Sequence, residues 1–251
     1  DISTQTAALR TGKIDWIFDV SWENAASLQK TNPELKWKRY LQAAHQNVIF
    51  MRTDKPELPF KDIKVRRALA MAIDKEAIKT SYYGGNAELL STPVAPYPEL
   101  INLFTPLEKQ SAIVQEYYGY HPDKAKQLLA EAGYPNGFKT SIVCWQNQVD
   151  LLSIVADSWA KIGVDVSLDV REYSVYTSVR SSRSHKEMIL AQLSSVAPTS
   201  INWARNDMST NFSWINDARV QATWDIVRVN VVVNQPKADA ALKELFPYVL
   251  D

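Results

Sequence analysis

The spacing of apolar residues predicts that helices and strands alternate along most of the chain. A repeat of three to four residues indicates a helix with one buried face, and strict alternation indicates a half-buried strand. On this basis we expect helices over residues 4–11, 23–30, 62–77, 122–132, 149–162, 174–184, 218–229 and 236–245. We expect strands over residues 14–20, 35–41, 47–52, 138–145, 164–170 and 187–193.

The order of these elements indicates an α/β protein. From residue 120 to 193 helices and strands alternate one for one, which predicts a single sheet with helices packed on it. Start and stop signals support the helices: Asp62 is placed to cap one of them, Pro122 to begin another and Gly133 to end it. Residues 87–120 contain four prolines, so we expect a long irregular loop there.

Composition and charge exclude several classes of function. Lys and Arg together number 28, as do Asp and Glu, and this balance disfavours nucleic acid as a partner. No run of apolar residues is long enough to suggest a transmembrane helix. A single cysteine, Cys144, rules out an internal disulfide and a cysteine-based zinc site. Glycine is scarce, with 7 residues, whereas Trp and Tyr number 8 and 11.

The chain shows no catalytic or metal-binding motif. It contains no nucleophile elbow and no glycine-rich nucleotide-binding motif, and its histidines lack metal-site spacing. We interpret His121 as a solvated or capping residue at a helix start, and His185 as solvated in a polar turn. Cys144 is expected to act as a small buried hydrophobic residue and Trp159 as a core residue. We therefore expect no enzyme activity, no cofactor and no metal.

Aromatic and amide side chains cluster instead where strands are followed by helices. Ligands of α/β sheets bind at the carboxyl ends of strands, and Trp, Tyr, Asn and Gln can stack and hydrogen-bond there without adding charge. A helix cap beside a core tryptophan is the alternative interpretation of the first group. The candidate ligand-binding residues are Trp145, Gln146 and Asn147, then Tyr173 and Tyr176, then Ser195, Asn202 and Trp203.

Several runs in order resemble one family. Residues 60–78 (FKDIKVRRALAMAIDKEAI) resemble the D-x-x-V-R-x-A-L-x-x-A-I-D-K-E-x-I segment of family 5 extracellular solute-binding proteins, the dipeptide, oligopeptide and nickel receptors of ABC importers. Residues 122–138 (PDKAKQLLAEAGYPNGF) and 159–166 (WAKIGVDV) are similar to two further motifs of that family. Residues 5–15 and 211–216 resemble two more, so the likeness extends over nearly the whole chain.

The resemblance implies a periplasmic-binding-protein type II-like fold whose two lobes close on a ligand. Residues 1–46 would form the end of lobe I, which is incomplete here, and residues 47–251 would form lobe II. The chain begins without Met or a signal-peptide pattern, and we expect it to be a C-terminal fragment. The implied protein is a monomeric receptor at the periplasmic or extracellular face of a bacterial membrane. It would capture peptides or a related small solute and deliver them to a membrane permease.

Two departures from the family bear on the ligand. Peptide-binding members place a carboxylate just after the strand that ends here near Leu193, but residues 194–203 (SSVAPTSINW) contain none. Dipeptide binders carry an Arg where this chain has Val149 and Asp150. A neutral or longer ligand therefore fits better than a dipeptide held by both termini. The alternatives are a ligand-sensing domain of a regulator with the same fold and, with no supporting motif, a hydrolase.

Overall fold

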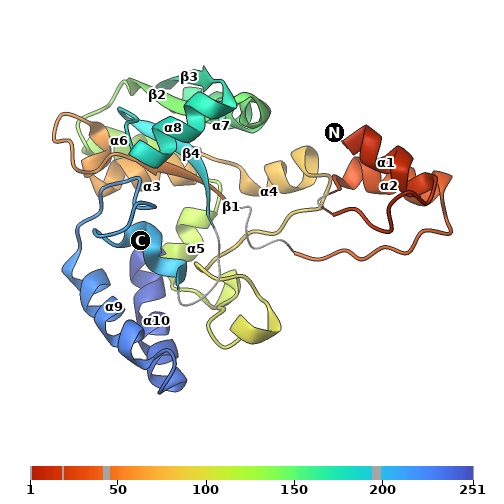
Figure 1. Ribbon diagram of the computed structural model, residues 1–251. Coiled ribbons are helices and arrows are strands. Elements are labelled where there is room, and N and C mark those ends of the chain that lie inside the picture. Colours follow the sequence, from red (N-terminus) through yellow and green to blue (C-terminus); the bar gives the residue numbers. More distant parts are fainter. Residues whose placement is uncertain (1, 19, 42–45, 194–198, 251) are drawn as a thin grey trace. The chain divides into compact units, whose positions relative to one another are not determined.

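A computed structural model describes residues 2–18, 20–41, 46–193 and 199–250 (Figure 1). The chain separates into two compact units, Asp1–Leu41 and Gln42–Asp251.

The first unit contains two helices, α1 (Ile2–Arg10) and α2 (Trp22–Thr31). Ser21 begins α2, because its Oγ accepts a hydrogen bond from the Asn24 amide at 3.3 Å. The guanidinium of Arg10 ties the end of α1 to the end of α2 by donating to Asn32 Oδ1 at 2.9 Å. The strands expected over residues 14–20 and 35–41 do not form in the described part of this unit. Alternation alone was insufficient, since a strand also needs a neighbour to complete its hydrogen bonds.

The second unit is built on a four-stranded mixed sheet with the order β1-β4-β2-β3. Strand β2 is parallel to β3 and to β4, and β1 is antiparallel to β4. This confirms the α/β class and the single sheet expected for residues 120–193. The strands are β1 (Gln46–Met51), β2 (Phe138–Trp145), β3 (Val164–Arg171) and β4 (Met188–Leu193).

The helices of this unit follow the predicted order with local differences. The helix expected over residues 62–77 begins as predicted, with Asp62 Oδ1 accepting from the Lys64 amide at 2.8 Å, but it ends at Met71. Asp74 then caps a separate turn by accepting from the Ala77 amide at 2.9 Å. The α-helices are α3 (Ile63–Met71), α4 (Lys75–Ala77), α5 (Ala112–Tyr118), α6 (Pro122–Glu131), α7 (Val149–Ala160), α8 (Tyr173–Ser182), α9 (Ala218–Asn230) and α10 (Gln235–Leu250).

Helix α5 corrects the expectation that residues 87–120 are irregular throughout. Ser111 caps it, with its Oγ accepting from the Val114 amide at 3.4 Å. Val114 and Tyr117 are buried, so packing rather than the helical propensity of a short segment stabilises it. The rest of the segment holds only the short turns η3 (Pro98–Leu100) and η4 (Leu107–Lys109) among its described elements.

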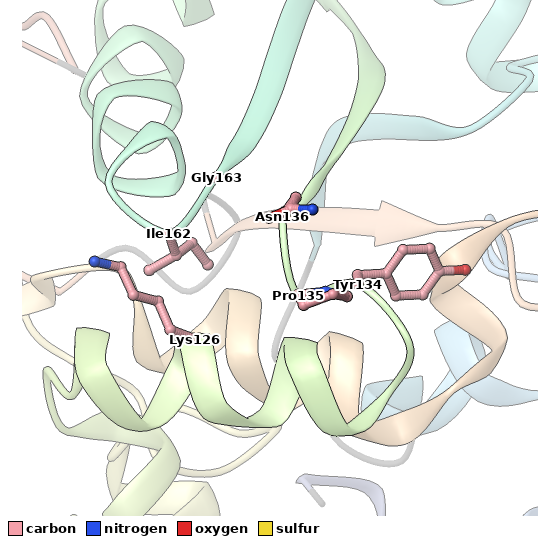
Figure 2. Close-up of a pocket in the computed structure, with 6 residues that line it drawn as sticks. All are labelled: Lys126, Tyr134, Pro135, Asn136, Ile162 and Gly163. Carbon is pink, nitrogen blue, oxygen red and sulfur yellow. The ribbon is translucent and has the colours of Figure 1, made fainter.

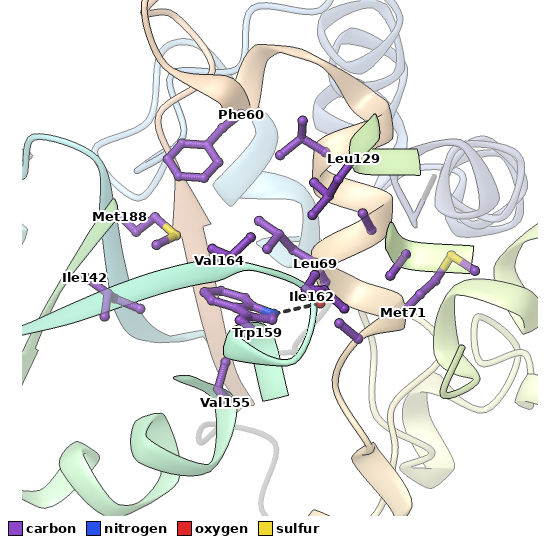
Figure 3. Packing of buried hydrophobic residues seen from close by; sticks show 14 of the residues in the cluster. Phe60, Leu69, Met71, Leu129, Ile142, Val155, Trp159, Ile162, Val164 and Met188 are labelled. Atoms are coloured by element: carbon purple, nitrogen blue, oxygen red, sulfur yellow. Dashed lines mark hydrogen bonds between the residues drawn. The ribbon is translucent and has the colours of Figure 1, made fainter. Parts of the chain in front are cut away.

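One face of the sheet packs against α3, α6 and α7, and we call it the apolar face (Figure 3). Trp159 is 1% exposed there, and its indole donates to the Leu69 carbonyl at 2.9 Å, which confirms it as a core residue. Cys144 is buried on the same face. Burial and, to a smaller extent, the Asp169 carboxylate raise the pKa of the Cys144 thiol to about 11, so it is scarcely ionised at neutral pH.

The opposite face packs against α8 and residues from the segment 203–214, and we call it the aromatic face. Its cluster contains Phe50, Tyr176 and Phe212, and Trp145 and Trp203 pack at its margin. Phe50 and Phe212 meet edge to face with ring centres 5.1 Å apart. Helices α9 and α10 form a further cluster with residues of η6 (Thr199–Ala204).

Candidate functional site

The carboxyl ends of the three parallel strands lie at one edge of the sheet. Trp145, the last residue of β2, pairs in register with Arg171, the last residue of β3. Strand β4 runs in the same direction and ends at Leu193. The geometry therefore brings together the ends of β2, β3 and β4, as the order of elements predicted. We call this the carboxyl edge.

Two aromatic rings meet at the carboxyl edge. The ring centres of Trp145 and Tyr173 are 4.7 Å apart, at an angle of 57° between their planes. Trp145 is half-buried at the margin of the aromatic face, whereas Tyr173 is 59% exposed in the first turn of α8. The pair therefore offers a fixed aromatic surface that a ligand could cover.

Tyr176 lies beneath this pair rather than beside it. It is 4% exposed, its ring centre is 6.4 Å from that of Tyr173, and its hydroxyl donates to the Leu190 carbonyl at 2.8 Å. Burial raises the pKa of the Tyr176 hydroxyl, so it stays protonated and serves as a donor. The sequence predicted Tyr176 as a ligand-binding residue, and the structure places it in a buried position under Tyr173.

A short 3₁₀ turn, η5 (Gln146–Gln148), connects the edge to α7. Gln146 and Asn147 are exposed, as a ligand-binding role requires. Gln148, which sequence analysis did not select, is 6% exposed and bridges two strands. Its Oε1 accepts from the Trp145 amide at 3.2 Å, and its Nε2 donates to the Leu190 carbonyl at 3.4 Å. The one signal in the sequence for this bridging role of Gln148 is its position directly after Trp145, Gln146 and Asn147.

The third predicted group is divided. Ser195 lies outside the described residues. Trp203 is half-buried and packs both on the aromatic face and against the cluster of α9 and α10. Asn202 Oδ1 accepts from Nη1 of Arg205 at 2.9 Å. Arg205 in turn pairs with Asp207 at 2.6 Å, so the described contacts of Asn202 lead away from Trp145 and Tyr173.

A second polar cluster lies on the aromatic face and corrects the interpretation of His185. This residue is 1% exposed rather than solvated. Its Nε2 lies 2.9 Å from the Phe212 carbonyl and, because a carbonyl only accepts, Nε2 carries the proton. Burial lowers the pKa of His185 to about 4, so the ring is neutral at pH 7. Its partners lie far away in sequence, which is why local composition gave the wrong environment.

Trp214 completes that cluster between two guanidinium groups. The Arg52 guanidinium carbon lies 3.6 Å from the Trp214 ring centre, and that of Arg183 lies 5.1 Å from it. Arg183 and Trp214 both have positive φ, 52° and 54°, which is uncommon for residues other than glycine. No partner for Nδ1 of His185 is found among the described residues.

A shallow hollow of about 180 Å³ lies at the opposite edge, where β2 and β3 begin (Figure 2). Its lining includes Lys126 and the turns that precede these strands. The turns approach so closely that a Cβ on Gly137 would lie 1.9 Å from the Gly163 carbonyl oxygen. This hollow contains none of the residues predicted to bind ligand.

The described side chains do not gather into a metal site. No group of three or more His, Cys, Asp or Glu residues that could hold an ion occurs in the part of the chain that the structure covers. Within the same residues, no helix is both long and apolar enough to cross a bilayer.

Comparison with known proteins identifies the family. A model described as bacterial extracellular solute-binding proteins, family 5 Middle, matches residues 1–246. The chain belongs to this family. Its similarity to periplasmic binding proteins of known structure confirms the expected fold class.

Three relatives show how far the similarity extends. Heme-binding protein A of Haemophilus influenzae is 33% identical over 187 residues, covering 70% of this chain and 31% of that protein. Glutathione-binding protein GsiB of Pectobacterium atrosepticum is 31% identical over 172 residues, covering 67% and 30%. The solved structure of DppA from Helicobacter pylori, in complex with the peptide STSA, matches with a TM-score of 0.75 and 25% identity, covering 99% and 47%. The chain spans less than half the length of each of these three proteins.

Proposed function

We propose that this chain is part of a receptor subunit of an ABC importer, which captures a peptide or a related small solute at the carboxyl edge. Membership of the family supports a ligand-binding role without catalysis. The names of the relatives indicate a range of solutes, namely heme, glutathione and a tetrapeptide. The carboxyl edge would bind an uncharged part of such a solute by stacking and amide hydrogen bonds.

The observation that carries this proposal is the Trp145–Tyr173 pair. The centres of the two rings are 4.7 Å apart, yet Tyr173 is 59% exposed. Tyr176 and Gln148 support the pair through hydrogen bonds to the Leu190 carbonyl. An aromatic surface that is fixed from beneath and open above is suited to stacking on a ligand with little loss of side-chain entropy.

The remaining parts of the proposal concern the whole protein. We assign residues 1–46 to the end of lobe I and residues 47–251 to lobe II, and the separation into units Asp1–Leu41 and Gln42–Asp251 supports that division. Closure of the two lobes would retain the ligand. The protein would act as a monomer at the periplasmic or extracellular face of the membrane and would deliver its ligand to a membrane permease. The family description supports this location.

Calorimetry on the full-length protein tests the proposal. The probes are the tetrapeptide STSA, glutathione and haem, after the ligands named for the relatives. We expect at least one to bind, and Trp145→Ala to weaken that binding at least several-fold by removing the stacking surface. Tyr173→Ala should act in the same direction, whereas Tyr248→Ala, at another exposed tyrosine, is the matched control.

Two results would contradict the proposal. The first is binding of a probe with the same affinity before and after the Trp145→Ala and Tyr173→Ala substitutions, with unchanged unfolding midpoints. The second is failure of the full-length protein to bind any of the probes. The isolated chain should bind weakly, because the proposal places part of the ligand site in lobe I outside residues 1–251. A submicromolar dissociation constant for the isolated chain would overturn that last expectation.

A further inference from the structure

A row of uncharged polar side chains lies at the carboxyl edge, where β1 and β4 meet. Asn47 and Gln192 are direct neighbours across the two strands. Gln192 Nε2 lies 3.5 Å from Asn47 Oδ1, and Asn47 Nδ2 donates to the Tyr83 hydroxyl oxygen at 3.2 Å. We call Gln192, Asn47 and Tyr83 the amide row.

The amide row and Trp145 lie at the same level of the sheet but on opposite faces. The parallel register that pairs Ile142 with Met188 places Trp145 beside Ala191, one residue before Gln192. Leu193, the next residue along, packs on the aromatic face. Since side chains alternate between faces along a strand, Gln192 projects on the apolar face and Trp145 on the aromatic face. A ligand lying across the edge would contact both.

The row is accessible, and its members are held in place. Asn47 and Gln192 are exposed, and Tyr83 is half-buried. Hydrogen bonds hold the backbone of Tyr83 at its amide and at its carbonyl. The amide donates to the Ile78 carbonyl at 3.1 Å, and the carbonyl accepts from Asn86 Nδ2 at 3.1 Å. The strand ladder fixes the backbones of Asn47 and Gln192. Each backbone is therefore held in place, and among the described residues the side-chain hydrogen bonds of the row are the two that join its members.

Ion pairs neutralise two cations on the elements that carry the edge. Lys79, four residues before Tyr83, pairs with Glu88 at 3.0 Å. Arg171, at the end of β3, pairs with Asp169 at 2.6 Å. Arg180 reaches the edge but directs Nη2 to the Gln192 backbone carbonyl at 3.5 Å and stacks its guanidinium over Phe212. The groups that the row itself presents are amides and a hydroxyl.

We propose that Asn47, Gln192 and Tyr83 form a second wall of the ligand site, which binds main-chain amide groups in an uncharged stretch of a peptide-like ligand. This inference rests on the proposed function. A carboxamide supplies both a donor and an acceptor, as a peptide group requires, and the hydroxyl of Tyr83 can donate while it accepts from Asn47. Such a row would select among ligands by hydrogen bonds to their main-chain amides rather than by contacts with the charged termini of a peptide.

The test uses the full-length protein and the tetrapeptide STSA with its amino terminus acetylated and its carboxyl terminus amidated. The dissociation constant of wild-type protein for this blocked peptide should lie within about tenfold of its value for the free peptide. Gln192→Ala and Tyr83→Phe should each weaken binding of the blocked peptide at least threefold, and together about tenfold, which corresponds to the loss of two hydrogen bonds. Tyr248→Phe, which removes a hydroxyl that bonds Asp217 at 2.6 Å, is the matched control and should leave binding unchanged.

Gln192→Glu provides a variant of nearly equal size that adds a negative charge to the row. It should weaken binding of the blocked peptide and shift preference toward the free peptide, whose ammonium group the carboxylate attracts. The inference is overturned if wild-type protein does not bind the blocked peptide, or if both Gln192→Ala and Tyr83→Phe bind it as wild type does. The proposed function fails separately, when no probe binds or when binding is insensitive to Trp145→Ala and Tyr173→Ala.

Discussion

The two faces of the sheet are stabilised in different ways. On the apolar face, helices α3, α6 and α7 bury aliphatic side chains around Trp159, and its single indole N–H has a carbonyl partner (Figure 3). On the aromatic face, α8 and the segment 203–214 bury a histidine and bring guanidinium groups over Phe212 and Trp214. Two residues there have left-handed backbone conformations.

The difference shows that close packing of side chains stabilises the apolar face, whereas directional contacts stabilise the aromatic face. A close-packed apolar face is sensitive to lost volume. A face built from rings, cations and single hydrogen bonds is sensitive to charge and to the loss of one partner. The aromatic face also carries Trp145 and Tyr173, so the face that depends on directional contacts is the one that positions the proposed site.

The largest expected effect is a loss of packing at Trp159. Trp159→Ala should lower the free energy of unfolding by about 4 kcal/mol, because it empties a site that is 1% exposed and leaves the Leu69 carbonyl unbonded. Trp214→Ala should cost about 2 kcal/mol, since that ring is half-buried and contributes mainly through its two guanidinium contacts. Chemical denaturation measures both. Equal losses would remove the distinction between the two faces.

Acid should act on the aromatic face through His185. The pKa of His185 is about 4 when folded, below its ordinary value of 6.5, so between these values the unfolded chain binds a proton that the folded chain does not. Stability is therefore lost as the pH falls from about 6.5 to about 4, by up to about 3 kcal/mol from this group. Denaturation measured at several pH values gives this slope.

The control for the acid effect is His185→Gln, which keeps an amide donor but does not titrate. Its unfolding free energy should vary less than that of wild type between pH 6.5 and 4. A wild-type slope that persists in His185→Gln would show that another group causes the loss.

The smallest expected effect concerns the support of the aromatic pair. Tyr176→Phe removes the hydrogen bond to the Leu190 carbonyl and should lower the unfolding free energy by about 1 kcal/mol. Tyr173→Phe removes the hydroxyl of a side chain that is 59% exposed, so stability should not change. Thermal unfolding monitored by circular dichroism compares the two. An equal effect of both substitutions would contradict the assignment of Tyr176 to the layer beneath the pair.

Sequence periodicity was sufficient where local signals and tertiary packing agree. Strand 138–145, the helix that starts at Pro122 and the core position of Trp159 were all predicted correctly. It failed where the outcome depends on a partner. Residues 14–20 and 35–41 alternate, but no strand pairs with them among the residues that the structure describes, and α5 depends on the burial of Val114 and Tyr117. Asp74 was visible in the sequence, but its capping role depends on the break that follows Met71.

The candidate site shows the same division. The strand order brought Trp145 and Tyr173 to one edge, because the carboxyl ends of parallel strands coincide. Sequence could not distinguish the exposed Tyr173 from the buried Tyr176, since both lie in the first turn of one helix. The amide row could not be predicted from the sequence either, because Asn47 and Gln192 are 145 residues apart and become neighbours only through antiparallel pairing of β1 with β4.

Hydrogen–deuterium exchange on the full-length protein shows whether the ligand binds at the carboxyl edge. The protein is compared with and without a saturating amount of whichever probe binds it: STSA, glutathione or haem. We expect ligand to slow exchange at residues 145–148 and 173–176 on the carboxyl edge. We expect no change in the turn at residues 134–137, beside the hollow on the opposite edge (Figure 2). Protection at residues 134–137 with none at 145–148 and 173–176 would show that the ligand binds away from the carboxyl edge.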